Sequence, residues 1–120
     1  MQKKVLVVED NDMNRRLIAT LVRSMDMELI EAVNGDEGVK RAREIHPDLV
    51  LMDIQMPVMD GFTAIRILKS DPATSDMKII ALTAFAMKGD KEKILESGCD
   101  GYLPKPIDVR RFAEEIGKYL

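Results

Sequence analysis

The chain has 120 residues, and we expect residues 1–120 to fold as a single domain. Hydrophobic residues make up 46% and charged residues 32%, a composition typical of globular proteins and unlike that of disordered ones. The net charge of −3 provides no general attraction to nucleic acid or to anionic lipid, so neither is expected as a direct partner. A single cysteine, Cys99, and the lack of an apolar segment long enough for a signal peptide or a membrane span predict a cytoplasmic location.

The first half of the chain alternates short apolar runs with segments of helical periodicity. The apolar run at 5–8 predicts a buried strand, and Asn11 or Asp12 is the expected N-cap of the following helix. That helix is predicted to have one apolar face, composed of Met13, Leu17, Leu21 and Met25, with Ile18 and Val22 beside them. A strand at 29–33, a helix at 36–45 and a strand at 49–52 are expected next.

The second half repeats this alternation. The predicted elements are a helix at 62–69, a strand at 79–82, a helix at 87–97, a strand at 102–103 and a helix at 109–120. Five strands that alternate with five helices predict an α/β fold with a flavodoxin-like, doubly wound parallel sheet in the order 2-1-3-4-5. A Rossmann fold is less favoured, because no glycine-rich G-x-G-x-x-G run follows the first strand.

Polar residues stand at the ends of the strong strands. Glu9 and Asp10 follow the first strand, Asp53 the third and Thr83 the fourth, and Lys105 lies just beyond the fifth. Because parallel strands all point the same way, and ligands bind outside their carboxyl ends, we expect these residues to share one edge of the sheet.

Three carboxylates at one edge would repel one another, since like charges within about 4–6 Å raise each other's pKa. A divalent cation removes this conflict, and Mg²⁺ (or Mn²⁺) suits a site composed of oxygen ligands. We therefore predict a metal site formed by Glu9, Asp10 and Asp53, with the backbone carbonyl of Gln55 as a further ligand.

Thr83 and Lys105 would add a hydroxyl group and an ammonium group to this metal site. A metal ion, a lysine and a hydroxyl group together can neutralise the three equatorial oxygens of a transferring phosphoryl group. Asp53 would be the nucleophile and form an acyl phosphate, and no histidine base is needed because an ionised carboxylate has no proton to lose.

Four motifs that carry these residues resemble those of two-component response-regulator receiver domains, which have the chemotaxis-regulator fold. They are VVEDN at 7–11, LMDIQMPVMDG at 51–61, LTA at 82–84 and YLPKP at 102–106. Each motif is weak by itself, but the four together at the strand ends are specific, and the resemblance covers essentially the whole chain. The run TAFAMKGD at 83–90 is most similar to stand-alone regulators of the cell-cycle type and to the receivers of hybrid histidine kinases.

The resemblance implies that Asp53 takes a phosphoryl group from a histidine kinase or phosphotransfer protein. It implies that Glu9 and Asp10 hold Mg²⁺ together with Asp53, and that Thr83 and Lys105 contact the phosphoryl group. On this view the chain is no enzyme for other substrates, since it is phosphorylated and dephosphorylated only at its own aspartate.

The resemblance also implies a conformational switch. Thr83 would move toward the phosphoryl group and Tyr102 would turn inward, which changes the face formed by the fourth helix, fifth strand and fifth helix. A downstream protein target would read that face, and the chain is expected to be a monomer or a weak phosphorylation-dependent dimer. The Lys105–Pro106 peptide is cis in the family, and we hypothesise that Phe85 shields the acyl phosphate from water.

Other functions fit the sequence less well. An aspartate-nucleophile phosphatase or phosphotransferase for a small substrate usually carries an acid–base aspartate two residues after the nucleophile, where this chain has Gln55. A flavodoxin would need a phosphate-binding loop after the first strand. We expect Cys99 to be a packing residue, His46 to lie on the surface, and the arginine pairs 15–16 and 110–111 to lie on solvated helix faces.

Overall fold

The computed structural model describes residues 2–56, 59–84 and 88–120. Its five parallel strands form one sheet in the order β2-β1-β3-β4-β5, which confirms the predicted fold. The strands are β1 (Lys4–Val8), β2 (Glu28–Ala32), β3 (Leu49–Asp53), β4 (Lys78–Thr83) and β5 (Gly101–Pro104). The helices are α1 (Asp12–Ser24), α2 (Gly35–Ile45), α3 (Gly61–Ser70), α4 (Lys88–Glu96) and α5 (Val109–Gly117).

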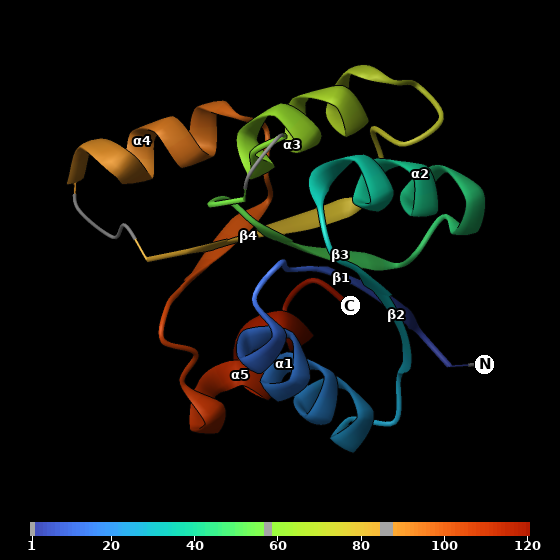
Figure 1. Ribbon diagram of the computed structural model, residues 1–120, viewed down its shortest axis with the longest axis vertical. Helices are drawn as coiled ribbons and strands as arrows, with labels where there is room; N and C mark the ends of the chain where they lie inside the picture. Colours follow the sequence, from blue (N-terminus) through green and yellow to red (C-terminus); the bar gives the residue numbers. More distant parts are fainter. Residues whose placement is uncertain (1, 57–58, 85–87) are drawn as a thin grey trace.

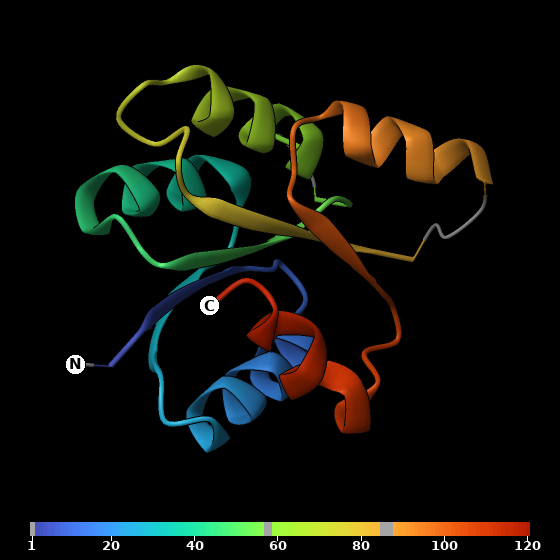
Figure 2. The same ribbon diagram turned by 180° about the vertical axis from the view of Figure 1, so that it is seen from behind.

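The sheet is the middle of three layers. Helices α2, α3 and α4 lie over one face, and α1 and α5 lie over the other (Figures 1 and 2). All five residues of β3 are buried, and in β4 only the first residue is exposed. Strands that are covered on both faces need apolar side chains on both, which explains their continuous rather than alternating apolar runs.

Two separate cores hold the layers together. Alternate residues of one strand enter different cores: Val50 and Met52 pack toward α2, α3 and α4, whereas Leu49 and Leu51 pack toward α1 and α5. Because successive side chains of a strand point to opposite faces of the sheet, the apolar residues of each strand are divided between the two cores. Within the described part of the chain, none of the helices has the length and apolar character needed to cross a lipid bilayer.

The predicted apolar face of α1 was partly wrong. The buried residues of this helix are Ile18, Ala19 and Val22, whereas 81% of Met13 and 37% of Leu17 are exposed. Ile18 and Val22 face the sheet. Met13 and Leu17 therefore lie at the margin of the surface that α1 packs against the sheet. The helix predicted at 109–120 ends earlier, at Gly117: Phe112 and Ile116 are buried, whereas Val109 at its start and Leu120 beyond its end are exposed.

Short polar turns join the strand ends to the helices. The side chain of Asn11 accepts a hydrogen bond from the Asn14 backbone N–H at 2.9 Å, which identifies Asn11 as the N-cap of α1. After β3 the chain passes very close to itself. A Cβ atom on Gly61 would lie 2.2 Å from the Asp53 carbonyl oxygen, so only glycine fits where α3 begins.

Candidate functional site

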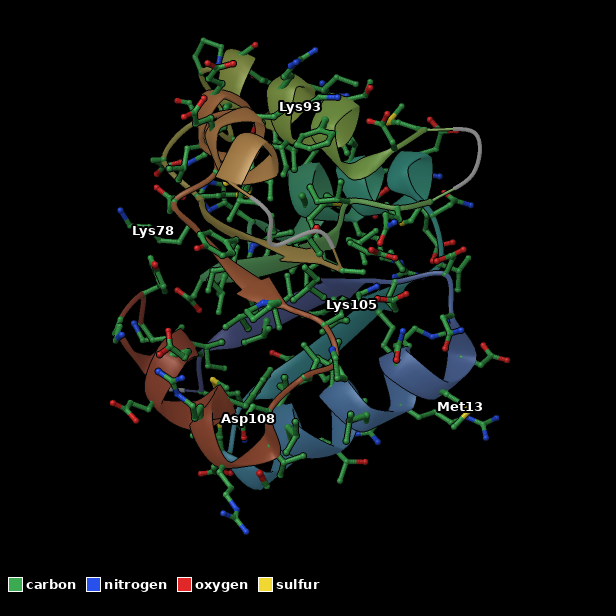
Figure 3. All side chains as sticks on the ribbon, turned by 90° about the vertical axis from the view of Figure 1, so that its left-hand side faces the viewer. Met13, Lys78, Lys93, Lys105 and Asp108 are labelled. Carbon is green, nitrogen blue, oxygen red and sulfur yellow. The ribbon has the colours of Figure 1, made fainter. Side chains whose placement is uncertain are left out.

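The polar residues predicted at the strand ends lie at one edge of the sheet. Asp53 is the last residue of β3 and Thr83 the last residue of β4, and these strands are direct neighbours. Glu9 continues the pairing of β1, because its backbone N–H donates to the Ala32 carbonyl at 3.1 Å. Lys105 follows β5, and its N–H donates to the Thr83 carbonyl at 2.7 Å. Figure 3 faces this edge and shows Lys105 there, with Met13 of α1 below it.

Three carboxylates meet at this edge. Each of Glu9, Asp10 and Asp53 has an oxygen within 4.8 Å of those of the other two. Glu9 is fully buried and Asp53 is 1% exposed, whereas Asp10 faces solvent. The prediction that these residues converge is thus correct in its geometry. The site is open to solvent on the Asp10 side and closed on the protein side.

Lys105 is the cation that faces these carboxylates. Its Nζ lies 2.9 Å from Asp53 Oδ1 and 3.0 Å from Glu9 Oε2. Burial by itself would lower the pKa of this ammonium group, but the two carboxylates outweigh it, and the pKa is raised above its ordinary value. With all groups ionised, three carboxylates and one ammonium group leave a local charge of −2.

The surplus negative charge and burial both disfavour ionisation of Glu9. Burial and the neighbouring Asp53 carboxylate, whose effect exceeds the opposing effect of Lys105, together raise the pKa of its carboxyl group from 4.5 to about 7. Its Oε1 accepts the Asn11 backbone N–H at 3.2 Å. Its Oε2 is buried and has no hydrogen-bond partner within the described residues beyond its ion pair with Lys105 Nζ, 3.0 Å away.

A buried carboxylate oxygen without a hydrogen bond, beside two further carboxylates, is a donor set that fits a hard divalent cation such as Mg²⁺. The predicted carbonyl ligand, Gln55, follows Asp53 closely, and its own N–H donates to Asp53 Oδ1 at 3.1 Å. This bond fixes the Asp53 carboxylate and the start of the loop after β3. The assignment of the Gln55 carbonyl as a ligand stays a prediction.

The remaining predicted residues lie around this centre. Thr83 is 1% exposed, and Tyr102 is partly buried against the core under α2, α3 and α4. Both have polar or electrostatic contacts of their own, and their roles in a switch stay predictions. The Lys105–Pro106 peptide bond is cis, as the resemblance implies. Phe85 lies outside the described residues.

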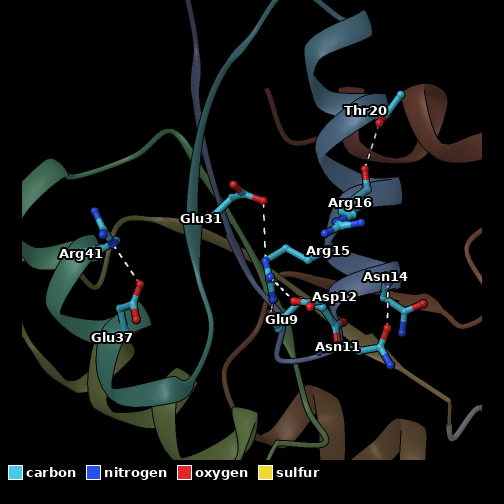
Figure 4. Close-up of polar contacts among 10 residues, drawn as sticks. All are labelled: Glu9, Asn11, Asp12, Asn14, Arg15, Arg16, Thr20, Glu31, Glu37 and Arg41. Atoms are coloured by element: carbon cyan, nitrogen blue, oxygen red, sulfur yellow. Dashed lines mark hydrogen bonds and ion pairs between the residues drawn. The ribbon is translucent and has the colours of Figure 1, made fainter.

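Sequence reasoning missed one residue at this edge. Arg15 was expected on a solvated helix face, but its side chain is only 16% exposed and turns back toward Glu9 (Figure 4). Helical side chains lean toward the N-terminus of the helix, so a long residue in the first turn of α1 can reach the end of β1. Its proximity in sequence to the acidic pair was the available signal.

Two residues expected to be bystanders lie away from the site. The Cys99 thiol is buried and donates to the Ile94 carbonyl at 3.1 Å, and burial raises its pKa, which disfavours a reactive thiolate. His46 is about half exposed and ends α2, where its Nε2 lies 3.2 Å from the Ala73 carbonyl oxygen. Both findings agree with the packing and surface roles expected.

Known proteins are similar to this chain in sequence and in fold. The family model of the response regulator receiver domain matches residues 5–117. The polar-differentiation response regulator DivK of Brucella ovis is 47% identical over 120 residues, which cover all of this chain and 98% of that protein.

Two solved structures have a similar fold and moderate sequence identity. The receiver domain of the sensor histidine kinase PA1611 of Pseudomonas aeruginosa, solved with a magnesium ion in its active-site cleft, has a TM-score of 0.91 and 32% identity. The alignment covers 99% of this chain and 98% of that one. The receiver domain of Ssk1 of Saccharomyces cerevisiae, crystallised with the histidine phosphotransfer protein Ypd1, has a TM-score of 0.89 and 30% identity over 98% and 88% of the two chains. By its sequence, fold and strand-end residues, this chain belongs to the response regulator receiver domains of two-component signalling.

Proposed function

We propose that the chain is a phosphorylation-controlled switch in which Asp53 accepts a phosphoryl group from a phosphohistidine of a kinase or phosphotransfer protein. The observation that carries the proposal is the placement of the buried Asp53 carboxylate at the end of a central strand, 2.9 Å from Lys105 Nζ and beside two further carboxylates. The magnesium ion in the PA1611 receiver and the Ypd1 partner of the Ssk1 receiver support it by analogy.

The transfer exchanges one bond to phosphorus for another. A carboxylate oxygen of Asp53 attacks, a phosphorus–oxygen bond forms, and the phosphorus–nitrogen bond of the donor breaks. The histidine nitrogen keeps the electron pair of the broken bond and takes a proton from solvent. Asp53 needs no base, and the Gln55 N–H holds its carboxylate in place through Oδ1. Lys105 already contacts Asp53 and would follow the charge onto the phosphoryl oxygens.

Mg²⁺ would be held by Glu9, Asp10 and Asp53 and, when bound, would neutralise charge on the phosphoryl oxygens. Lys105 and the buried Glu9 are already in place at this metal and phosphoryl site. Lys105 reaches both buried carboxylates, and Glu9 leaves one oxygen without a hydrogen bond among the described residues. Asp10, on the solvent side, supplies the third carboxylate without closing the route by which a donor protein would approach.

The output would be a change in the face formed by α4, β5 and α5. A groove of about 590 Å³ lies there, lined among others by Leu95 of α4, Tyr102 of β5 and Tyr119 beyond α5. We propose that Thr83 moves toward the phosphoryl group, that Tyr102 follows inward, and that a downstream protein distinguishes the two states. Binding one state better than the other is what shifts the population.

The phosphoryl group would stay on the chain until water removes it, so the chain would not turn over small phosphate esters. Gln55 stands where an acid–base aspartate of a phosphatase would be expected, which supports this view. A location in the cytoplasm suits Cys99, whose thiol forms no disulfide within the described residues.

The test is intact-mass spectrometry after incubation with acetyl phosphate and Mg²⁺. Wild-type protein should gain a single phosphoryl group that is stable in acid and labile in base, and Asp53→Asn should gain none. Lys78→Gln serves as a matched control, because Lys78 is an exposed residue at the opposite end of β4. No adduct should form when EDTA replaces Mg²⁺ during the incubation.

An adduct on the Asp53→Asn protein, or transfer that continues in EDTA, would overturn the assignment of the nucleophile or of the metal. Sustained release of inorganic phosphate from p-nitrophenyl phosphate would instead favour the small-substrate phosphatase. If wild-type protein gains no adduct from acetyl phosphate or from a phosphorylated histidine phosphotransfer domain, the proposed switch is wrong.

A further inference from the structure

We infer that Arg15 is a positioning residue for the acidic site: its guanidinium group fixes the turn between β1 and α1 that presents Glu9 and Asp10. The inference rests on the proposed function, since it concerns the same divalent-cation site. It goes beyond that function, because it assigns a role to a residue whose partners are Glu9, Asp12 and Glu31, and not the Asp53 carboxylate or Lys105.

The guanidinium group joins three elements. Its Nη1 donates to the Glu9 backbone carbonyl at 3.0 Å, at the end of β1. Its Nη2 donates to the carboxylate of Asp12, the first residue of α1. Its Nε lies 3.7 Å from the carboxylate of Glu31 on the neighbouring strand β2. Figure 4 shows Arg15 between these partners.

With the Arg15 contact, both the backbone and the side chain of Glu9 are held by neighbouring residues. Its N–H is bound to Ala32, its carbonyl to Arg15, and its side-chain oxygens face Asn11 and Lys105. The peptide group that links Glu9 to Asp10 is therefore held through its carbonyl by Arg15. Since the rotation of that peptide sets the direction of the next side chain, the Arg15 contact acts on where the exposed Asp10 carboxylate lies.

Burial distinguishes Arg15 from Arg16, its neighbour on α1. Its side chain is 16% exposed, whereas Arg16, the next residue on α1, is an exposed residue. This largely buried side chain forms charge-assisted hydrogen bonds to a carbonyl and to one carboxylate, with a second carboxylate 3.7 Å away, and these contacts hold the guanidinium group in a fixed geometry. Groups that orient metal ligands in this way commonly change metal affinity about 10–100-fold when they are removed.

The test measures the affinity for Mn²⁺ by the electron paramagnetic resonance signal of the free ion, with Mg²⁺ competition as a second readout. Arg15→Met keeps the aliphatic stem and removes the guanidinium group, and it should weaken Mn²⁺ binding about tenfold. Arg16→Met, on the exposed side of the same helix, is the matched control and should bind as wild type does. Glu31→Gln removes only the most distant partner, and it should weaken binding less than Arg15→Met.

The folded fraction of each variant is measured by circular dichroism in EDTA, where no metal contributes. Equal Mn²⁺ affinity in folded Arg15→Met and wild-type protein would overturn the inference, even if the variant is less stable, because its role would then be structural only. Should Arg15→Met fail to fold, Arg15→Leu, which also lacks a donor, replaces it, and unchanged affinity in that variant would have the same meaning. Failure of wild-type protein itself to bind Mn²⁺ better than Asp53→Asn would instead contradict the proposed metal site.

Discussion

Two lysine–aspartate pairs lie at opposite ends of the sheet and have nearly the same length. Lys105 Nζ is 2.9 Å from Asp53 where the strands end, and Lys69 Nζ is 3.0 Å from Asp100 where β4 and β5 begin. Both lysine side chains are mostly covered, at 15% and 18% exposure. Distance and burial of the lysine thus do not distinguish a functional pair from a structural one.

The surroundings of the two pairs do distinguish them. Lys69 also donates to the carbonyls of Met77 at 2.6 Å and Ser75 at 3.3 Å, and Asp100 accepts the Ile79 N–H at 2.8 Å. That pair is neutral and well supplied with hydrogen bonds. Lys105 instead faces two buried carboxylates, with a third nearby, so negative charge remains in excess. The excess charge, rather than the ion pair, marks the ligand site.

The largest difference is expected when each lysine is replaced by methionine. Lys105→Met should reduce the rate of Asp53 phosphorylation by acetyl phosphate about a hundredfold, because it removes a fixed cation from the developing charge of the phosphoryl group. With Mg²⁺ present the variant should stay folded. Phosphorylation is followed by intact mass over time, and a rate within threefold of wild type would contradict the role given to Lys105.

The matched change at the other pair should affect stability and leave the chemistry intact. Lys69→Met should lower the free energy of unfolding by about 2 kcal/mol, because it leaves a partly buried Asp100 carboxylate and the Met77 carbonyl without their cation. Urea unfolding measures the loss. Phosphorylation of the folded variant should proceed at the wild-type rate, and a hundredfold reduction would remove the distinction between the two pairs.

The excess charge also predicts a dependence of stability on pH in metal-free protein. The pKa of Glu9 is raised from 4.5 to about 7, so the folded state binds this proton more tightly than the unfolded state does. The resulting stability is fully present below pH 4.5 and is lost as the pH rises through 7, a decrease of about 2 kcal/mol between about pH 5 and 8. Urea unfolding in EDTA measures it. Glu9→Gln should remove this component, and an equal decrease in that variant would assign it to other groups.

The residues that converge at the candidate site could be predicted from the sequence because they stand at the ends of strands. Asp53 and Thr83 directly follow apolar runs, and a parallel sheet must bring the ends of neighbouring strands together. The contact between Lys69 and Asp100, 31 residues apart, left no pattern in the sequence. Arg15 was misjudged for a related reason: helical periodicity gives the face of a residue, but not how far a long side chain reaches along the helix.

The smallest change in the free energy of unfolding is expected at an exposed ion pair, which we compare with the two buried pairs. Arg43 Nε lies 3.3 Å from the Asp71 carboxylate, a separation close to those of the buried pairs, but half of the arginine side chain is exposed. Water screens this attraction and both side chains lose freedom to maintain it, so Arg43→Ala should change the free energy of unfolding by less than about 0.5 kcal/mol. Urea unfolding in low and high salt measures the change, and Mn²⁺ affinity should not move. A loss as large as that of Lys69→Met would mean that separation, rather than the surrounding hydrogen bonds and charge, governs the contribution of charged pairs in this domain.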